Sequence, residues 1–118
     1  KQFTVIIQAG VNHRSYHNTD DEHDIRSMLF DARRNPSIGE IFFNGVSIPA
    51  DMDAADADRL NRLNRFMEAE LGGDYYIPPL QQADVRVAHN DRFGIHYDQA
   101  TVDRISAKMI RHVTGSDF

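Results

Sequence analysis

The chain has 118 residues and no cysteine, which excludes a disulfide framework, a thiolate zinc site and a cysteine nucleophile. Its formal net charge of −5 argues against a protein that coats nucleic acid through bulk electrostatics. The composition is that of a globular domain, and no apolar run is long enough to span a bilayer or to form a secretory signal. We therefore expect a single cytoplasmic domain over residues 1–118, without membrane contact.

The N-terminal third predicts a strand followed by a helix. Residues 2–9 form the strand, and their β-branched centre, Val5-Ile6-Ile7, indicates a central strand buried on both faces. Thr19 and Glu22 match a capping box that opens a helix, which Pro36 ends. The predicted inward stripe of this helix is Ile25, Met28, Leu29 and Ala32. Phe30 lies about 140° from Ile25 around the helix. An exposed aromatic there indicates a contact with a partner, and the alternative is that a neighbouring loop covers it.

The middle of the chain carries the clearest turn signal. Asn44-Gly45 lies inside the apolar segment 41–48, and this dipeptide is typical of a type I′ hairpin because both turn residues need positive φ. A helix is predicted next, from Asp53 to Leu71, with Gly72-Gly73 as its C-cap. Its inward face is predicted to hold Leu60, Leu63, Met67 and Leu71. Residues 75–80 predict a short extended piece.

The C-terminal third predicts a second hairpin and a last helix. Residues 84–88 alternate as a strand, and residues 93–97 are expected to return antiparallel to it. Asp98 caps a helix that ends at Gly115, with Val102, Ile105, Met109 and Val113 facing inward. The expected order is β-α-β-β-α-β-β-α. This order predicts an α+β fold, with a mostly antiparallel sheet and the helices packed on one face.

The strongest candidate site is the loop between the first strand and the first helix. Such a loop is aimed by a rigid strand and faces the free N–H groups of a helix N-terminus. Arg14 would anchor phosphate or carboxylate, although the acidic residues 20–22 oppose an anion there. The alternative is a solvated polar loop. The candidate ligand-binding residues are Asn12, His13, Arg14, Ser15, Tyr16 and His17.

Three other clusters favour ordinary structural interpretations. His13 and His17, with His23 and Asp24, carry metal-ligating groups, but spacing of four aligns two histidines only on a helix, so we expect no metal. The aspartates within 51–58 suit a helix N-terminus. Residues 89–92 together with 96–98 combine His, Asp, Arg and Tyr for acid–base chemistry, yet they are also typical turn residues.

A secondary basic patch is predicted on the outer side of the last helix. Arg104, Lys108 and Arg111 lie at positions i, i+4 and i+7, where a phosphate-binding stripe and a solvated face are both possible. Near this helix, residues 85–100 contain Asn90 and Phe93-Gly94 in a hairpin that leads into it. This stretch resembles the C-terminal part of plasmid antirestriction proteins, which implies an inhibitor of host defence.

Two classes of function follow. The first is a small non-catalytic binding or regulatory protein, an inhibitor or a ligand-sequestering protein, with no cofactor. Its partner would be a protein or an anionic small molecule such as a phosphate-bearing compound, and nucleic acid is not expected. The second is a small metal-independent phosphodiesterase, nuclease or toxin-like enzyme that uses His13, His17 and Arg14. A homo-oligomer is expected through Phe30 or a sheet edge.

Overall fold

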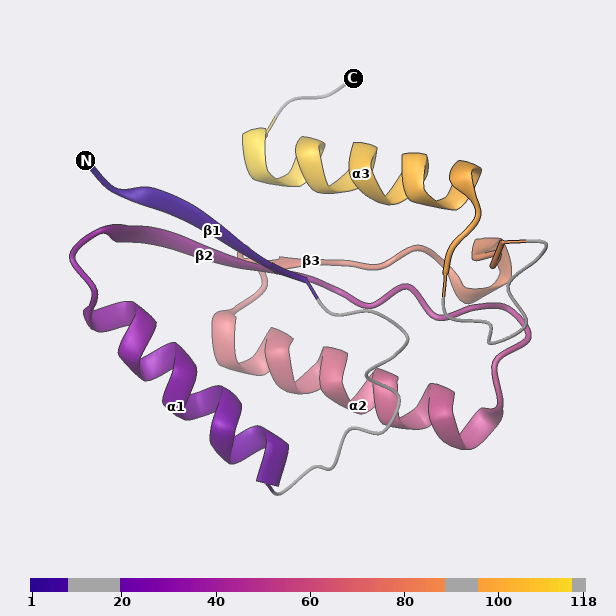
Figure 1. Ribbon diagram of the computed structural model, residues 1–118, viewed down its shortest axis with the longest axis horizontal. Coiled ribbons are helices and arrows are strands. Elements are labelled where there is room, and N and C mark those ends of the chain that lie inside the picture. The colour runs from indigo at the N-terminus through magenta and orange to yellow at the C-terminus, as the bar shows by residue number, and fades with distance from the viewer. Residues whose placement is uncertain (9–19, 89–95, 116–118) are drawn as a thin grey trace.

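The computed structural model describes residues 1–8, 20–88 and 96–115 (Figure 1). Helices and strands alternate along these segments. In chain order the elements are β1 (Phe3–Gln8), α1 (Asp20–Arg34), β2 (Ile38–Asn44), α2 (Ala54–Leu71), β3 (Tyr76–Ile77), the 3-10 turn η2 (Gln82–Asp84) and α3 (Gln99–Thr114).

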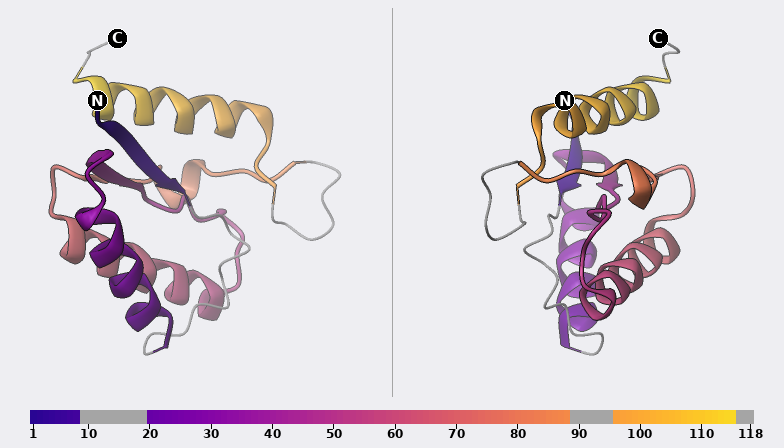
Figure 2. Two further views of the ribbon diagram at one scale, coloured as in Figure 1. Left: turned by 60° about the vertical axis from the view of Figure 1, so that its left-hand side comes forward. Right: turned by 90° about the vertical axis from the view of Figure 1, so that its right-hand side faces the viewer.

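The strands form one sheet in the order β1-β2-β3, and both pairs are parallel. The mixture of helix and strand is confirmed, but the expected antiparallel arrangement is wrong. The reason is that α1 and α2 each carry the chain back to the end of the sheet where the preceding strand began. All three strands therefore run in the same direction. Figures 1 and 2 show α1 and α2 on one face and α3 on the opposite face, so the expectation of helices on a single face is wrong as well.

No hairpin forms at Asn44-Gly45. Asn44 ends β2, and the chain continues beyond it without a hairpin turn. Residues 41–49, on both sides of this point, are all buried. The Gly45 N–H donates to the carbonyl of Ile77 at 2.8 Å, and a Cβ on Gly45 would lie 2.8 Å from that oxygen and from Cδ of Pro79. This glycine therefore permits a close approach between backbone segments, and its φ is not positive.

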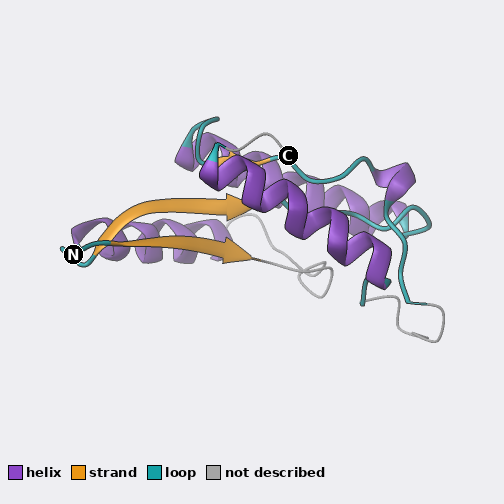
Figure 3. Ribbon diagram, turned by 90° about the horizontal axis from the view of Figure 1, so that it is seen from above, coloured by secondary structure: helices purple, strands orange, loops and turns teal. Residues whose placement is uncertain are grey.

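The central strand is β2 and not β1. Val5, Ile6 and Ile7 are only half-buried because β1 lies at the edge of the sheet. Phe3 is 60% exposed. Seen from above, β1 and the first part of β2 extend beyond α3, which leaves that part of the sheet face uncovered by a helix (Figure 3). The continuous apolar run that marks a strand covered on both faces is the one in β2.

The main core lies between the sheet and the α1–α2 pair. Residues from β2 and α2 dominate it, and the predicted inward positions of α2 are confirmed at Leu60, Leu63 and Met67. On α1 only Leu29 is buried, whereas Met28 is 48% exposed and was wrongly placed inward. The position of α1 explains this difference. The helix covers β1 and β2, and β1 is the outer strand of the sheet, so α1 lies at the periphery of the core.

Several predicted helix ends are confirmed. The Asp53 carboxylate accepts from the N–H groups of Ala55 and Asp56, and Gly72 adopts a φ of 91° after the last turn of α2. Gly115 ends α3 in the left-handed region with φ 67°. The capping residue Thr19 lies outside the described residues.

The second predicted hairpin shows one bridge within the described residues. Val87 pairs antiparallel with Tyr97, and the Ala88 N–H donates to the His96 carbonyl at 2.8 Å. This bridge stands apart from the three-stranded sheet. The turn that would join its two sides, residues 89–95, lies outside the described part of the chain.

Candidate functional site

The parallel strands bring three chain segments to one edge of the sheet. β1 ends at Gln8, β2 at Asn44 and β3 at Ile77, and β2 pairs with both neighbours at these last residues. The first turn of α3 lies toward the same edge (Figure 1). In open parallel sheets, ligands bind outside the carboxyl ends of the strands, so a ligand site is expected at this edge.

A cleft of about 170 Å³ opens at this edge, between the strand ends and α3. Four of its residues come from α3 at positions i, i+3, i+4 and i+7, which form one face of the helix. The cleft is therefore bounded by the ends of β1 and β2 on one side and by a single helix face on the other. Its lining residues are Gln8, Asn44, Gly45, Ser47, Tyr97, Val102, Ile105, Ser106 and Met109.

Two side-chain amides stand at the strand ends. Asn44 is only 8% exposed, and within the described residues its amide has no hydrogen-bond partner. No fully buried polar side-chain atom in the described part of the chain lacks a partner, so the Asn44 amide reaches the cleft. The Gln8 Nε2 donates to the thioether sulfur of Met109 at 3.4 Å, and a thioether is a weak acceptor. Both amides can therefore serve a ligand.

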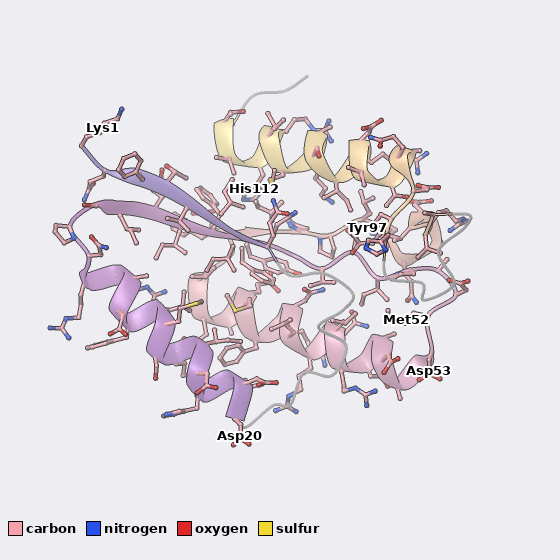
Figure 4. All side chains as sticks on the ribbon, in the orientation of Figure 1. Lys1, Asp20, Met52, Asp53, Tyr97 and His112 are labelled. Atoms are coloured by element: carbon pink, nitrogen blue, oxygen red, sulfur yellow. The ribbon has the colours of Figure 1, made fainter. Side chains whose placement is uncertain are left out.

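Tyr97 lines the cleft, and it lies near the start of α3 (Figure 4). Its hydroxyl donates to the Ser47 carbonyl at 2.5 Å. Burial raises the pKa of Tyr97 to about 12, so the phenol stays protonated at neutral pH. The hydroxyl of Ser47 in turn accepts from the Leu80 N–H at 3.1 Å. Tyr97 therefore ties the chain before α3 to the chain after β2.

Hydrogen bonds fix the first turn of α3 beside the cleft. The Asp98 carboxylate accepts from the Thr101 N–H at 2.8 Å, and hydrogen bonds from Thr101 lower the pKa of Asp98. The Thr101 hydroxyl accepts from the Arg86 N–H at 3.1 Å, and Thr101 is buried. These bonds set the position of the helix face that borders the cleft.

The predicted loop site, Asn12 to His17, lies outside the described residues. It follows Gln8 within a few positions of the sequence, and Gln8 lines the cleft. The assignment of these six loop residues to ligand binding therefore stays a prediction. Of the acid–base cluster, residues 89–92 also lie outside the described segments, while His96 is exposed and Tyr97 serves the contact above.

The predicted basic patch divides into two parts. Arg104 and Lys108 donate to the backbone carbonyls of Asp84 at 3.5 Å and Pro79 at 3.1 Å, respectively. These two cations thereby tie α3 to the segment that follows β3. Arg111 is exposed. None of the three lines the cleft.

A larger hollow of about 510 Å³ lies on α1, but all of its lining residues belong to that one helix. A single helix face cannot enclose a ligand, so this hollow is open surface. Phe30 is part of it and is 60% exposed, with the Arg34 guanidinium 5.1 Å from its ring centre. No group of three or more His, Asp or Glu side chains in the described segments is arranged to hold a metal ion.

The cleft residues Gln8, Asn44 and Ser106 were not identified from the sequence. The available signal was an amide at the end of an apolar strand, once at Gln8 and once at Asn44. Because Asn44-Gly45 was interpreted as a turn, the Asn44 amide was placed at the tip of a hairpin and was not considered as a strand-end group. A parallel interpretation would have placed both amides at one edge.

No protein-family model, no curated protein and no solved structure matches the chain. Among the helices of the described segments, none combines the length and the apolar character needed to cross a membrane.

Proposed function

We propose that the chain is a small non-catalytic binding protein whose ligand occupies the cleft at the carboxyl edge of the sheet. The observation that carries the proposal is the Asn44 side chain, which lines this cleft and whose amide has no hydrogen-bond partner among the described residues. No fully buried side-chain N or O atom of the described residues lacks a partner, so the Asn44 amide stays accessible from the cleft. A ligand in the cleft can therefore complete its hydrogen bonds.

The chemistry of the lining favours binding over catalysis. Its polar side chains are two amides, two serine hydroxyls and the Tyr97 phenol. Amides do not titrate near neutral pH, and the raised pKa of Tyr97, about 12, keeps its proton in place. Such groups orient and recognise a ligand without exchanging protons with it.

The proposal includes the loop Asn12 to His17 as a second contact for the ligand. Arg14 supplies a fork of donors that suits phosphate or carboxylate, and a nearby imidazolium adds charge below about pH 6.5. A phosphate-bearing small molecule, or an acidic group of a protein partner, would use this loop while another part of it enters the cleft. The enzymatic alternative uses His13, His17 and Arg14 for acid–base chemistry.

We also propose self-association through the open edge at β1, with a second copy of the chain as partner. The strand runs from Phe3 to Gln8 without a charged residue or a proline, the devices that usually protect an edge. Two copies of β1 paired antiparallel would form a continuous sheet with two-fold symmetry. Thr4→Lys should convert the dimer into a 13.5 kDa monomer in sedimentation, whereas Ser27→Lys on the exposed side of α1 should not. A monomeric wild type at micromolar concentration would contradict self-association.

The binding proposal is tested by two-dimensional amide NMR with a library of uncharged and anionic fragments. We expect binding fragments to shift the amide signals of Gln8, Asn44 and Ser106 together. Ser106→Ala should weaken these fragments, while Ser27→Ala, which removes a hydroxyl from an exposed position of α1, should not. Hits confined to other surfaces, or no hits, would overturn the proposal.

A further inference from the structure

We propose that the cleft at the carboxyl edge receives an uncharged, planar nitrogen heterocycle with adjacent hydrogen-bond donor and acceptor groups, the chemistry of a nucleobase edge. The inference rests on the proposed binding function and names the class of ligand. It is carried by the size of the cleft, the absence of charge in its lining and the placement of its amides.

The size of the cleft limits the ligand to about one ring system. Its volume of about 170 Å³ corresponds to about six water molecules at about 30 Å³ each. Typical sites for drug-sized ligands span about 300–1,000 Å³. A fused or single heterocyclic ring fits such a space, while a larger ligand would place only one part of itself there.

The lining contains no charged side chain among the described residues. The nearest cation along this face of α3, Lys108, donates to the Pro79 carbonyl at 3.1 Å. An ionised group entering the cleft would lose hydration without meeting an opposite charge, which is unfavourable. The part of the ligand that enters is therefore neutral.

The hydrogen-bonding groups match a donor–acceptor edge. A side-chain amide offers a donor and an acceptor side by side, and Asn or Gln pairs in this two-point manner with the edge of adenine. Asn44 presents such an amide from the end of β2, and it has no competing partner among the described residues. Gln8 presents another from β1, and a ligand would displace only its weak bond to the Met109 sulfur.

The opposite wall of the cleft suits the face of a ring. Val102, Ile105 and Met109 project from one side of α3. A methionine side chain adapts its shape to irregular gaps, and its sulfur packs favourably against aromatic rings. Polar groups at the strand ends and an apolar wall on the helix together favour a flat molecule that is polar only at its rim.

Adenine is the probe for the test, titrated into the full chain and followed by amide NMR at neutral pH. A ligand of this size is expected to bind with Kd of about 0.1–1 mM. The shifts should fall on Gln8, Asn44 and Ser106. Unsubstituted purine, which lacks the exocyclic amino group, should bind about tenfold more weakly because it leaves an amide acceptor unpaired.

Matched variants separate recognition from folding. Gln8→Ala and Ser106→Ala should each weaken adenine at least threefold, whereas Gln2→Ala just before β1 and Ser27→Ala on α1 should leave Kd unchanged. Asn44→Ala should weaken adenine about tenfold. If Asn44→Ala does not fold, the Gln8 and Ser106 variants decide the result.

Two negative outcomes have different meanings. If neither adenine nor uracil shifts the cleft signals while inorganic phosphate or other fragments do, the assigned ligand class is wrong and the binding function stands. If no probe shifts these signals, the proposed function falls as well. Equal affinities for adenine and purine would also overturn the assignment.

Discussion

The two faces of the sheet differ in how completely they are packed. On the α1–α2 face, side chains of β2 and α2 form a continuous core, and Leu60 is fully buried. On the other face, only Thr101 of α3 is buried, and Val102 and Ile110 are 39% and 46% exposed. The first face therefore supplies most of the stability. The second retains a cleft and polar groups, which are the properties of a binding surface.

The largest expected change in unfolding free energy comes from truncating a side chain in the core of the α1–α2 face. Leu60→Ala should lower the free energy of unfolding by about 2–5 kcal/mol, because it removes apolar contacts and leaves a cavity. Ile105→Ala on α3 should cost about 1 kcal/mol, since Ile105 is half-buried. Urea unfolding followed by circular dichroism measures both changes. Equal losses would show that the two faces contribute alike.

A buried amide gives the next effect. Asn64 accepts from the Val46 N–H at 2.8 Å and donates to the Val46 carbonyl at 3.0 Å. Asn64→Ala leaves both backbone groups without partners and should cost about 2–4 kcal/mol in unfolding free energy. Asn61→Ala, at a half-buried position of the same helix, should cost less than about 1 kcal/mol. A similar loss in both variants would rule out a special role for Asn64.

Gly45 tests the close approach at the cleft edge. Gly45→Ala places a Cβ against the Ile77 carbonyl and Pro79, so it should destabilise the fold by about 1–3 kcal/mol. Gly73→Ala meets no atom within 4 Å and serves as the control. Thermal unfolding of the two variants makes the comparison. A neutral Gly45→Ala would contradict the packing of β2 against the segment after β3.

The last effect appears at alkaline pH. The pKa of Tyr97 is raised to about 12 in the folded chain from an ordinary value near 10.0, so the unfolded chain loses this proton first. Stability should be fully present below about pH 10 and fall between about pH 10 and pH 12. Tyr76, whose pKa is also raised to about 12, adds to the fall. Tyr97→Phe should reduce the slope of urea midpoint against pH, and an unchanged slope would contradict a buried, protonated Tyr97.

Local signals in the sequence predicted the helices well. Asp53, Gly72 and Gly115 lie at helix ends as expected, because capping depends on a few neighbouring residues. The apolar spacing of α2 also identified its buried face. These features are decided within a few turns of one helix.

Strand pairing was not predicted, because it depends on residues far apart in the chain. Asn44-Gly45 matches a hairpin turn locally, but the carbonyl that Gly45 meets belongs to Ile77. The β-branched run at Val5-Ile6-Ile7 suggested a buried centre, yet its place at the edge follows from the sheet order. The cleft was missed for the same reason, since it forms only when the strand ends align.

Amide hydrogen exchange, measured by NMR with and without saturating adenine, tests the central claim most directly. The claim is that the α1–α2 face is the stable core and the α3 face is the binding surface. In the free chain, amides of α2 and β2 should exchange most slowly, and those of α3 faster. Adenine should slow exchange in α3 and at the ends of β1 and β2 while α2 stays unchanged. Slower exchange in α3 than in α2 in the free chain, or protection by adenine confined to α1 and α2, would contradict it.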